Sequence, residues 1–243
     1  MRTTQRHRLK ENEFAHVIDR AAVSLEANRR RVLAIAALVV IVLGAFGGYL
    51  LWRARTSAAA GELLARASVV LDAPVAASPS PGQSPEPGSY PTEQAKLEAG
   101  LATLLSAAEA YPRTAAGVAA RYRAAGVLGL LDRPEEAAAR FQEVMDLAGR
   151  DSVYYDMARL GRIVSQAQAA HYDQAIAALQ GFTSGSAGEV PPDAVLMQLG
   201  RVYLMAGKTT EAQQAFQRLL DEYPESQSAS DARREVEALK VGG

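Results

Sequence analysis

The chain has 243 residues, a formal net charge of −1 at pH 7 and no cysteine. The near-zero charge gives no support for nucleic-acid binding, which requires a basic patch or stripe. The lack of cysteine excludes disulfides, thiolate metal sites and thiol catalysis. Alanine-rich segments with few β-branched runs favour an all-α solenoid.

Residues 1–31 are predicted to form a cytoplasmic tail with an amphipathic helix. One face of that helix would carry five apolar side chains, namely Phe14, Val17, Ile18, Ala21 and Leu25. This face could lie on the cytoplasmic membrane surface or against the cytosolic loops of a partner protein. It could equally be an extension of the next segment that lipid headgroups cover.

Residues 32–52, VLAIAALVVIVLGAFGGYLLW, contain no charged side chain. A helix of this length reaches about 30 Å, the thickness of the hydrocarbon core of a bilayer, so we predict a transmembrane helix. Tyr49 and Trp52 would sit at the interface. The segment that precedes it is too long for a cleaved signal peptide, which favours an uncleaved anchor. Gly44 and Gly48 form a GxxxG pattern through which two anchors could pack as a homodimer, although glycine is common in membrane helices.

Arginines decide the predicted orientation. Arg29, Arg30 and Arg31 precede the span, with further basic residues behind them, and Arg53 and Arg55 follow it. Because positive charge is retained in the cytoplasm, the tail is predicted inside and the following domain outside. In a bacterium this is a single-pass inner-membrane protein with a periplasmic domain.

Residues 53–72 are predicted to be the first helix of an imperfect repeat. Its partner would be the helix from Glu93 to Ala110, which has a leucine stripe. Between them, residues 73–92 form a Pro/Ser/Gly-rich insertion that has almost nothing to bury. We therefore predict a disordered or extended loop there.

The clearest repeat begins with Leu199-Gly200 and ends at Pro224. A small residue at Gly200 and another at Ala212 would let two antiparallel helices approach closely, and Phe216 would fill the space between them. This spacing is typical of the tetratricopeptide repeat.

The pattern recurs within residues 93–226. Three marker alanines, Ala137, Ala175 and Ala212, are 38 and 37 residues apart. The pair Leu160-Gly161 repeats the opening, but it lies two residues further from its marker alanine than Leu199-Gly200 does. A longer first helix or turn is expected there. Residues 227–243 would form a capping helix and tail, since such stacks need a polar end.

A binding groove is predicted on the inner face of the first helices. The residue after each Leu-Gly pair would point into it, which selects Arg162 and Arg201. The other candidates are Tyr122, Tyr155, Met197 and Met205. Flexible methionines and charge-assisted arginine hydrogen bonds would suit a peptide with acidic groups or a terminal carboxylate. Alternatively, the arginines are solvated and the methionines fill gaps in the packing.

No catalytic, cofactor or metal site is predicted. The three histidines, His7, His16 and His171, are far apart, and no HExxH, GxSxG or phosphate-loop motif occurs. The sequence therefore favours a binding protein over an enzyme.

The tail RLKENEFAHVIDRAAVSLEANRRR, one span and tetratricopeptide repeats together resemble the ancillary Sec-translocon subunit family. The resemblance implies association with translocon subunits, periplasmic chaperones or emerging chains, while the Pro/Ser insertion departs from that family. Two other functions fit the residues: an envelope-assembly or cell-division scaffold for cell-wall or outer-membrane machinery, and a passive oligomer whose repeats pair with themselves.

Overall fold

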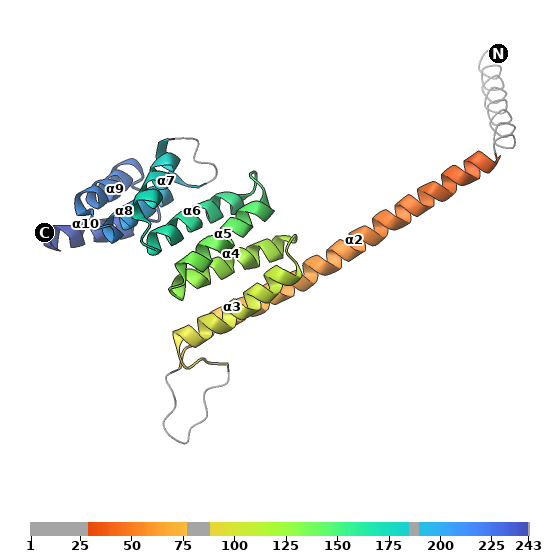
Figure 1. Ribbon diagram of the computed structural model, residues 1–243, viewed down its shortest axis with the longest axis horizontal. Helices are drawn as coiled ribbons and strands as arrows, with labels where there is room; N and C mark the ends of the chain where they lie inside the picture. Colours follow the sequence, from red (N-terminus) through yellow and green to blue (C-terminus); the bar gives the residue numbers. More distant parts are fainter. Residues whose placement is uncertain (1–28, 77–87, 185–189, 243) are drawn as a thin grey trace, which may run out of the picture. The chain divides into compact units, whose positions relative to one another are not determined.

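The computed structural model describes residues 29–76, 88–184 and 190–242, and their regular elements are all α-helices (Figure 1). The chain divides into two compact units, Met1–Arg55 and Thr56–Gly243. The predicted amphipathic helix of the tail lies outside the described residues. The prediction of an all-α solenoid is confirmed.

Helix α2 (Arg29–Leu71) contains the whole predicted span. Within the first unit its large apolar side chains are exposed, among them Leu33, Ile41 and Trp52. A methyl group added to Gly44 or Gly48 would meet nothing within 4 Å. The length and apolar composition of this helix suit a membrane span, although such a helix near an amino terminus can also be a signal sequence.

The second unit begins with the last turns of α2, which pack on α3 (Glu93–Ala110). Ala67 is buried in this contact, and a Cβ on Gly100 would lie 2.4 Å from Cδ2 of Leu71. The two ends of the predicted insertion are held together, because the Tyr90 amide donates to the Pro74 carbonyl at 3.0 Å and the Tyr90 carbonyl accepts from Ala76 at 3.0 Å. These bonds close the base of the segment, while residues 77–87 lie outside the described residues.

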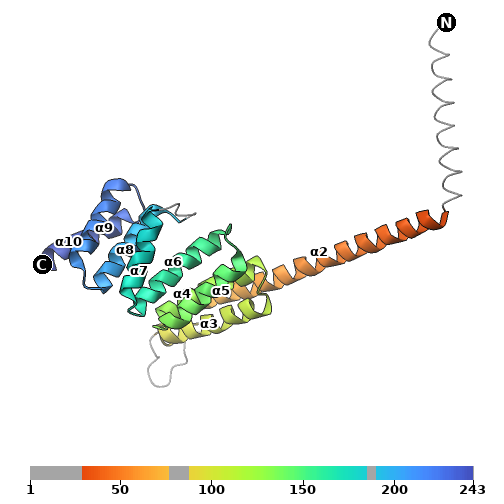
Figure 2. The same ribbon diagram turned by 45° about the horizontal axis from the view of Figure 1, so that its top comes forward.

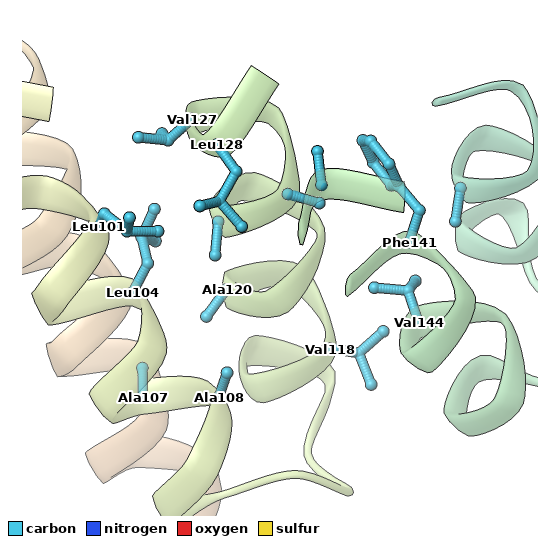
Figure 3. Close-up of a cluster of buried hydrophobic side chains, with 14 of the residues drawn as sticks. Leu101, Leu104, Ala107, Ala108, Val118, Ala120, Val127, Leu128, Phe141 and Val144 are labelled. Carbon is cyan, nitrogen blue, oxygen red and sulfur yellow. The ribbon is translucent and has the colours of Figure 1, made fainter. Parts of the chain in front are cut away.

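Seven further helices complete the second unit. They are α4 (Ala115–Leu130), α5 (Pro134–Ala148), α6 (Val153–Gln168), α7 (Tyr172–Ser184), α8 (Pro192–Met205), α9 (Thr209–Glu222) and α10 (Ala229–Gly242). Figures 1 and 2 show α4 to α9 as successive antiparallel helices. Figure 3 shows the core between α3, α4 and α5, where Leu104 lies beside Leu128 and Val144 lies beside Val118.

The same turn joins the helices of each pair. Asp132, Ala170 and Gly207 have φ values of 58°, 63° and 71°, and the residue after each donates its amide to the carbonyl five residues earlier. This is the helix C-terminal motif in which a left-handed residue lets the amides satisfy the last free carbonyls. A fully buried alanine follows five residues after each turn, at Ala137, Ala175 and Ala212, so the three pairs share one register.

In the pair α8–α9 the helices approach closely, as the sequence predicts. A Cβ on Gly200 would lie 2.4 Å from Cε1 of Phe216, and the Phe216 ring is fully buried. The ring therefore occupies the space that a side chain on Gly200 would need.

The middle pair, α6–α7, differs. In the pair α8–α9, Gly200 lies seven residues before the turn residue Gly207. In the pair α6–α7 the turn residue is Ala170, and the residue seven positions before it is Ile163, so Ile163 is the equivalent of Gly200. Ile163 is buried against α7, so an isoleucine stands where the next pair has glycine. Gly161 instead faces backward, with its Cβ position 2.5 Å from Cζ of Phe141 on α5. The dipeptide Leu160-Gly161 is therefore not the equivalent of Leu199-Gly200.

Candidate functional site

A cleft of about 520 Å³ lies between the alternate helices α4, α6 and α8, and we call it the inner cleft. Its walls are mainly apolar, with Asp156 as the one charged residue among the described residues that line it. The α4 wall comprises Tyr122, Ala125, Gly126, Gly129 and Leu130, with Phe141 beneath it; the α6 wall comprises Val153, Asp156, Met157, Leu160, Gly161, Val164, Ser165 and Gln168; and the α8 wall comprises Val190, Pro191, Ala194 and Gln198.

Three large apolar side chains of this cleft are open to solvent. Leu130 is 72% exposed, Val153 46% and Met157 39%. Isolated exposed apolar residues are ordinary, but these three line one cleft, Leu130 on its α4 wall and Val153 and Met157 on its α6 wall.

The inner cleft continues into a second chamber of about 610 Å³ between α2 and α4. Four residues line both: Tyr122, Gly126, Leu130 and Phe141. The second chamber also has charged residues, Asp72 and Arg123, and Arg123 donates from Nη1 to Oγ of Ser68 at 2.6 Å. The two chambers thus adjoin at these four residues, and the second one is the more polar.

Tyr122 is held at the junction by aromatic contacts. Its ring lies 5.5 Å from the ring of Phe141 and 5.8 Å from that of Tyr154, both edge-on. Burial, and then the neighbouring Tyr154, raise the pKa of the Tyr122 hydroxyl above its ordinary 10.0. Tyr122 therefore stays neutral throughout the physiological range and presents an uncharged wall.

The turns define which positions are equivalent along this face. The turn residues are Asp132, Ala170 and Gly207. The residues six positions before them are Gly126, Val164 and Arg201, and the residues two positions before them are Leu130, Gln168 and Met205. The residues from α4 and α6 line the inner cleft, whereas Arg201 and Met205 continue the line of Ala194 and Gln198 along α8 beyond it.

Of the six residues that the sequence predicts for the groove, Tyr122 lines the inner cleft. Arg201 and Met205 are 45% and 42% exposed, and Arg201 Nη2 lies 3.8 Å from a carboxylate oxygen of Asp231 on α10. Met197 is 3% exposed and packs in the core with Phe216, so the prediction that it meets a ligand is wrong in this structure.

The remaining two predicted residues face other helices. Arg162 donates from Nη1 to Oε1 of Gln142 on α5 at 2.8 Å, and Tyr155 packs against the first core cluster. Neither lines the inner cleft. The equivalence of Arg162 and Arg201 fails because the Leu-Gly pairs are out of register by two residues, which on a helix is a rotation of about 200°. Counting back from the marker alanines Ala175 and Ala212 would have paired Arg201 with Val164.

Within the described residues, no group of three His, Cys, Asp or Glu side chains could hold a metal ion. The inner cleft offers a hydroxyl and carboxamides, from Ser165, Gln168 and Gln198. The two carboxamides can hydrogen-bond a ligand, whereas the Ser165 hydroxyl donates to the Gly161 carbonyl at 3.0 Å.

A tetratricopeptide-repeat family model matches residues 194–226, which correspond to α8, α9 and the turn after them. Residues 194–226 are a tetratricopeptide repeat. No curated protein matches the chain. Among solved structures, the chain is similar to "Crystal structure of MamA", at 16% identity and a TM-score of 0.44 over 60% of this chain and 78% of that one. It is also similar to "Crystal structure of YrrB: a TPR protein with an unusual peptide-binding site", at 17% identity and a TM-score of 0.37 over 57% and 84% of the two chains.

Proposed function

We propose that this protein is a binding scaffold that holds a peptide segment of a partner protein in the inner cleft. The observation that carries the proposal is the exposure of three large apolar side chains in one cleft, Leu130 on its α4 wall and Val153 and Met157 on its α6 wall. Stacked helical repeats form extended surfaces of this kind for protein partners.

The shape of the groove favours a peptide over a compact small molecule. One chamber lies between α2 and α4 and the other between α4, α6 and α8, and the two adjoin at shared residues such as Tyr122 and Leu130. A chain-like ligand can follow such a path and place a large side chain in each chamber. Apolar walls would supply most of the affinity, and a few polar groups would fix the orientation.

We further propose that α2 anchors the protein in a bacterial inner membrane, with the tail in the cytoplasm and the solenoid in the periplasm. Support comes from the exposed apolar side chains of α2 and from the basic residues that precede the span. Protease added to the periplasmic face of spheroplasts should then degrade the chain after Trp52. Protection of the carboxyl-terminal domain would reverse the proposed topology.

For the partner we propose a translocon subunit, a periplasmic chaperone or an emerging chain, on the strength of the sequence resemblance. A scaffold for envelope assembly or cell division is the alternative. Copurification from detergent-solubilised membranes would distinguish the two functions. Translocon subunits among the copurified proteins would support the first, and cell-wall synthases would support the second. Homodimerisation through Gly44 and Gly48 is a separate proposal, which rests on the open space at both glycines.

A photo-crosslinking amino acid at position 130 tests the cleft directly. Installed in place of Leu130 in the full chain, in membranes, it should crosslink to a second protein. The same group in place of Leu147 on α5 is the control, because Leu147 is also an exposed leucine, at 39% against 72% for Leu130, and lies outside the cleft. Equal crosslinking at both positions, or none at position 130, would remove the cleft as the binding site.

A further inference from the structure

Two arginines on turns of the second unit have no partner. Arg113 lies in the turn between α3 and α4 (residues 111–114), and Arg150 lies in the turn between α5 and α6 (residues 149–152). We call these two turns the arginine turns. Both arginines are exposed, and within the described residues neither side chain makes a hydrogen bond, an ion pair or a ring contact. Every other lysine and arginine that the structure describes in this unit, except Arg233 on α10, contacts a carboxylate, a hydroxyl, a carboxamide or an aromatic ring.

The arginine turns lie at the same end of their helices. Helices α4 and α5 are antiparallel, and the rings of Tyr122 and Phe141 lie side by side, with their centroids 5.5 Å apart. Arg113 stands nine residues before Tyr122, and Arg150 stands nine residues after Phe141. Because both helices advance by about 1.5 Å per residue, the two arginines reach about the same level along the helix axes. The two turns can be followed in Figure 1.

The end of α2 that belongs to the second unit lies at this level too. Helices α2 and α3 are antiparallel, and Leu71 packs on Gly100. Ala60 stands eleven residues before Leu71, and Tyr111 stands eleven residues after Gly100. By the same count along the helix axes, the turn between α3 and α4 is level with Ala60.

This is the end from which the chain continues to the predicted span. The second unit begins at Thr56, four residues before Ala60, and only residues 53–55 separate it from the predicted span, residues 32–52. Three residues reach at most about 11 Å. If the span crosses a bilayer, this end of the solenoid is held close to the lipid headgroups, at whatever angle the two units meet.

Apolar groups stand beside the two free guanidinium groups. Tyr111 is half-buried and lies two residues before Arg113, and Leu147 is 39% exposed and lies three residues before Arg150. A guanidinium group binds phosphate oxygens in a bidentate manner. Tyrosine and leucine suit the boundary between headgroups and acyl chains. The arginine turns thus carry the groups that a phospholipid surface binds.

Acidic residues also stand near the arginine turns, namely Glu109, Asp146 and Asp151. Asp146 accepts a hydrogen bond from Nε2 of Gln142 at 2.9 Å, and none of the three carboxylates forms an ion pair within the described residues. Positive and negative charges therefore nearly balance on this edge. The contact with lipid depends on guanidinium groups that reach phosphates directly, and not on a long-range positive field.

We propose that the arginine turns dock the solenoid on the membrane surface, with Arg113 and Arg150 bound to the phosphates of phospholipid headgroups. This goes beyond the proposed peptide binding in the inner cleft, and it rests on the proposed membrane anchor.

A single fluorescent label tests the docking, because the chain has no cysteine of its own. The full chain with Leu147→Cys, which carries an apolar fluorophore, is reconstituted into vesicles of phosphatidylcholine and phosphatidylglycerol. Some vesicles contain lipid with a nitroxide on the headgroup, which quenches nearby fluorophores. Leu130→Cys with the same label is the matched control. It also replaces an exposed leucine, and by the residue count from Tyr122 and Phe141 it lies about 21 Å away along the helix axes.

The expected result is strong quenching at position 147 and little at position 130. The double variant Arg113→Gln/Arg150→Gln should lower the ratio of docked to undocked solenoid by about twenty-five-fold, since each arginine at an anionic lipid surface contributes about fivefold. Arg233→Gln is its control, because Arg233 is also exposed and unpaired among the described residues, and it should leave the quenching unchanged. The double variant should melt with the parent protein, since neither arginine has a partner in the fold.

Three outcomes would overturn the proposal. Quenching at position 147 that survives the double variant would exclude the two arginines. Equal quenching at positions 147 and 130, or none at position 147, would exclude docking through this edge. Flotation with the vesicles reports on the anchor separately: a chain that floats without quenching at position 147 refutes the docking alone, and a chain that does not float refutes the anchor and the docking together. Crosslinking from position 130 reports on the inner cleft in either case.

Discussion

Replacing Gly200 with alanine should destabilise the solenoid, although alanine is the better helix former. The new Cβ would lie 2.4, 2.6 and 2.7 Å from three atoms of the Phe216 ring. Carbon atoms pack at about 3.5–4.0 Å, so the ring or the helix must move by about 1 Å. Phe216 is fully buried and has no free space to enter. Overpacking of this kind costs about 1–3 kcal/mol.

The gain in helix propensity offsets about 0.5–1 kcal/mol of that cost. The middle of both ranges gives a net loss of about 1 kcal/mol, which for a domain of this size lowers Tm by about 2–4 °C. Gly126→Ala is the matched control, because it sits in a helix interior with nothing within 4 Å of its Cβ, and it should raise Tm. Both are measured by circular-dichroism melts.

A double variant separates overpacking from other causes. Gly200→Ala combined with Phe216→Leu should lose less stability than the two single changes added together, since leucine vacates part of the space that the new methyl group needs. A Gly200→Ala protein that melts at or above the parent temperature would refute the close approach of α8 and α9.

Three further predictions follow from individual contacts. Arg121→Met should cost about 1–3 kcal/mol in chemical denaturation, because it removes the hydrogen bond from Nη2 to the Ala108 carbonyl. Glu143 loses its ion pair with Arg121 but keeps the one with Arg140 at 3.0 Å, so it is not left unpaired. A loss of about 3–5 kcal/mol, which is typical of a broken buried pair, would show that Arg140 does not compensate. The Tyr122→Phe variant should lose less stability than the parent protein between pH 9 and about pH 11. Because the pKa of Tyr122 is raised in the folded state, its contribution to stability is complete below the unfolded pKa of 10.0 and disappears as the pH rises through the folded pKa. Identical curves of stability against pH for the two proteins would contradict this. Replacing residues 77–87 with a short Gly/Ser turn should change the free energy of unfolding by less than about 1 kcal/mol. Loop-closure entropy varies slowly with length, and the backbone hydrogen bonds of Tyr90 hold the two ends of the segment together. A large loss of helix content in this variant would show that the segment packs against the solenoid.

The fold could be predicted because its signals are local. The marker alanines, the Gly200–Phe216 spacing and the alanine-rich periodicity each report on neighbours in one helix pair, and the structure agrees with them. The groove was predicted less well. The dipeptide Leu160-Gly161 resembles a repeat opening, but its glycine accommodates Phe141 of the preceding helix, so its alignment with Leu199-Gly200 displaces α6 by two residues.

The inner cleft depends on relations that no short pattern contains. Its walls come from three helices that are far apart in sequence, and Gly161 is explained only by Phe141 on the preceding helix. The burial of Met197 likewise depends on its packing with α9 and α10. Gly126 is readable as an unexplained helical glycine, but only the structure shows that nothing fills the space beside it.

Ile163 has a consequence for how the solenoid comes apart. Helix α6 contributes Ala158 to one buried cluster and Ile163 to the next, so the two cores meet within a single helix. In a linear stack, cooperativity passes through each interface between neighbours, so the coupling between the two cores depends on α6. We expect the amides of α7 to α10 to exchange with deuterium as one group, separately from those of α3 to α5. A single exchange rate for all of them would show that the isoleucine leaves the coupling intact.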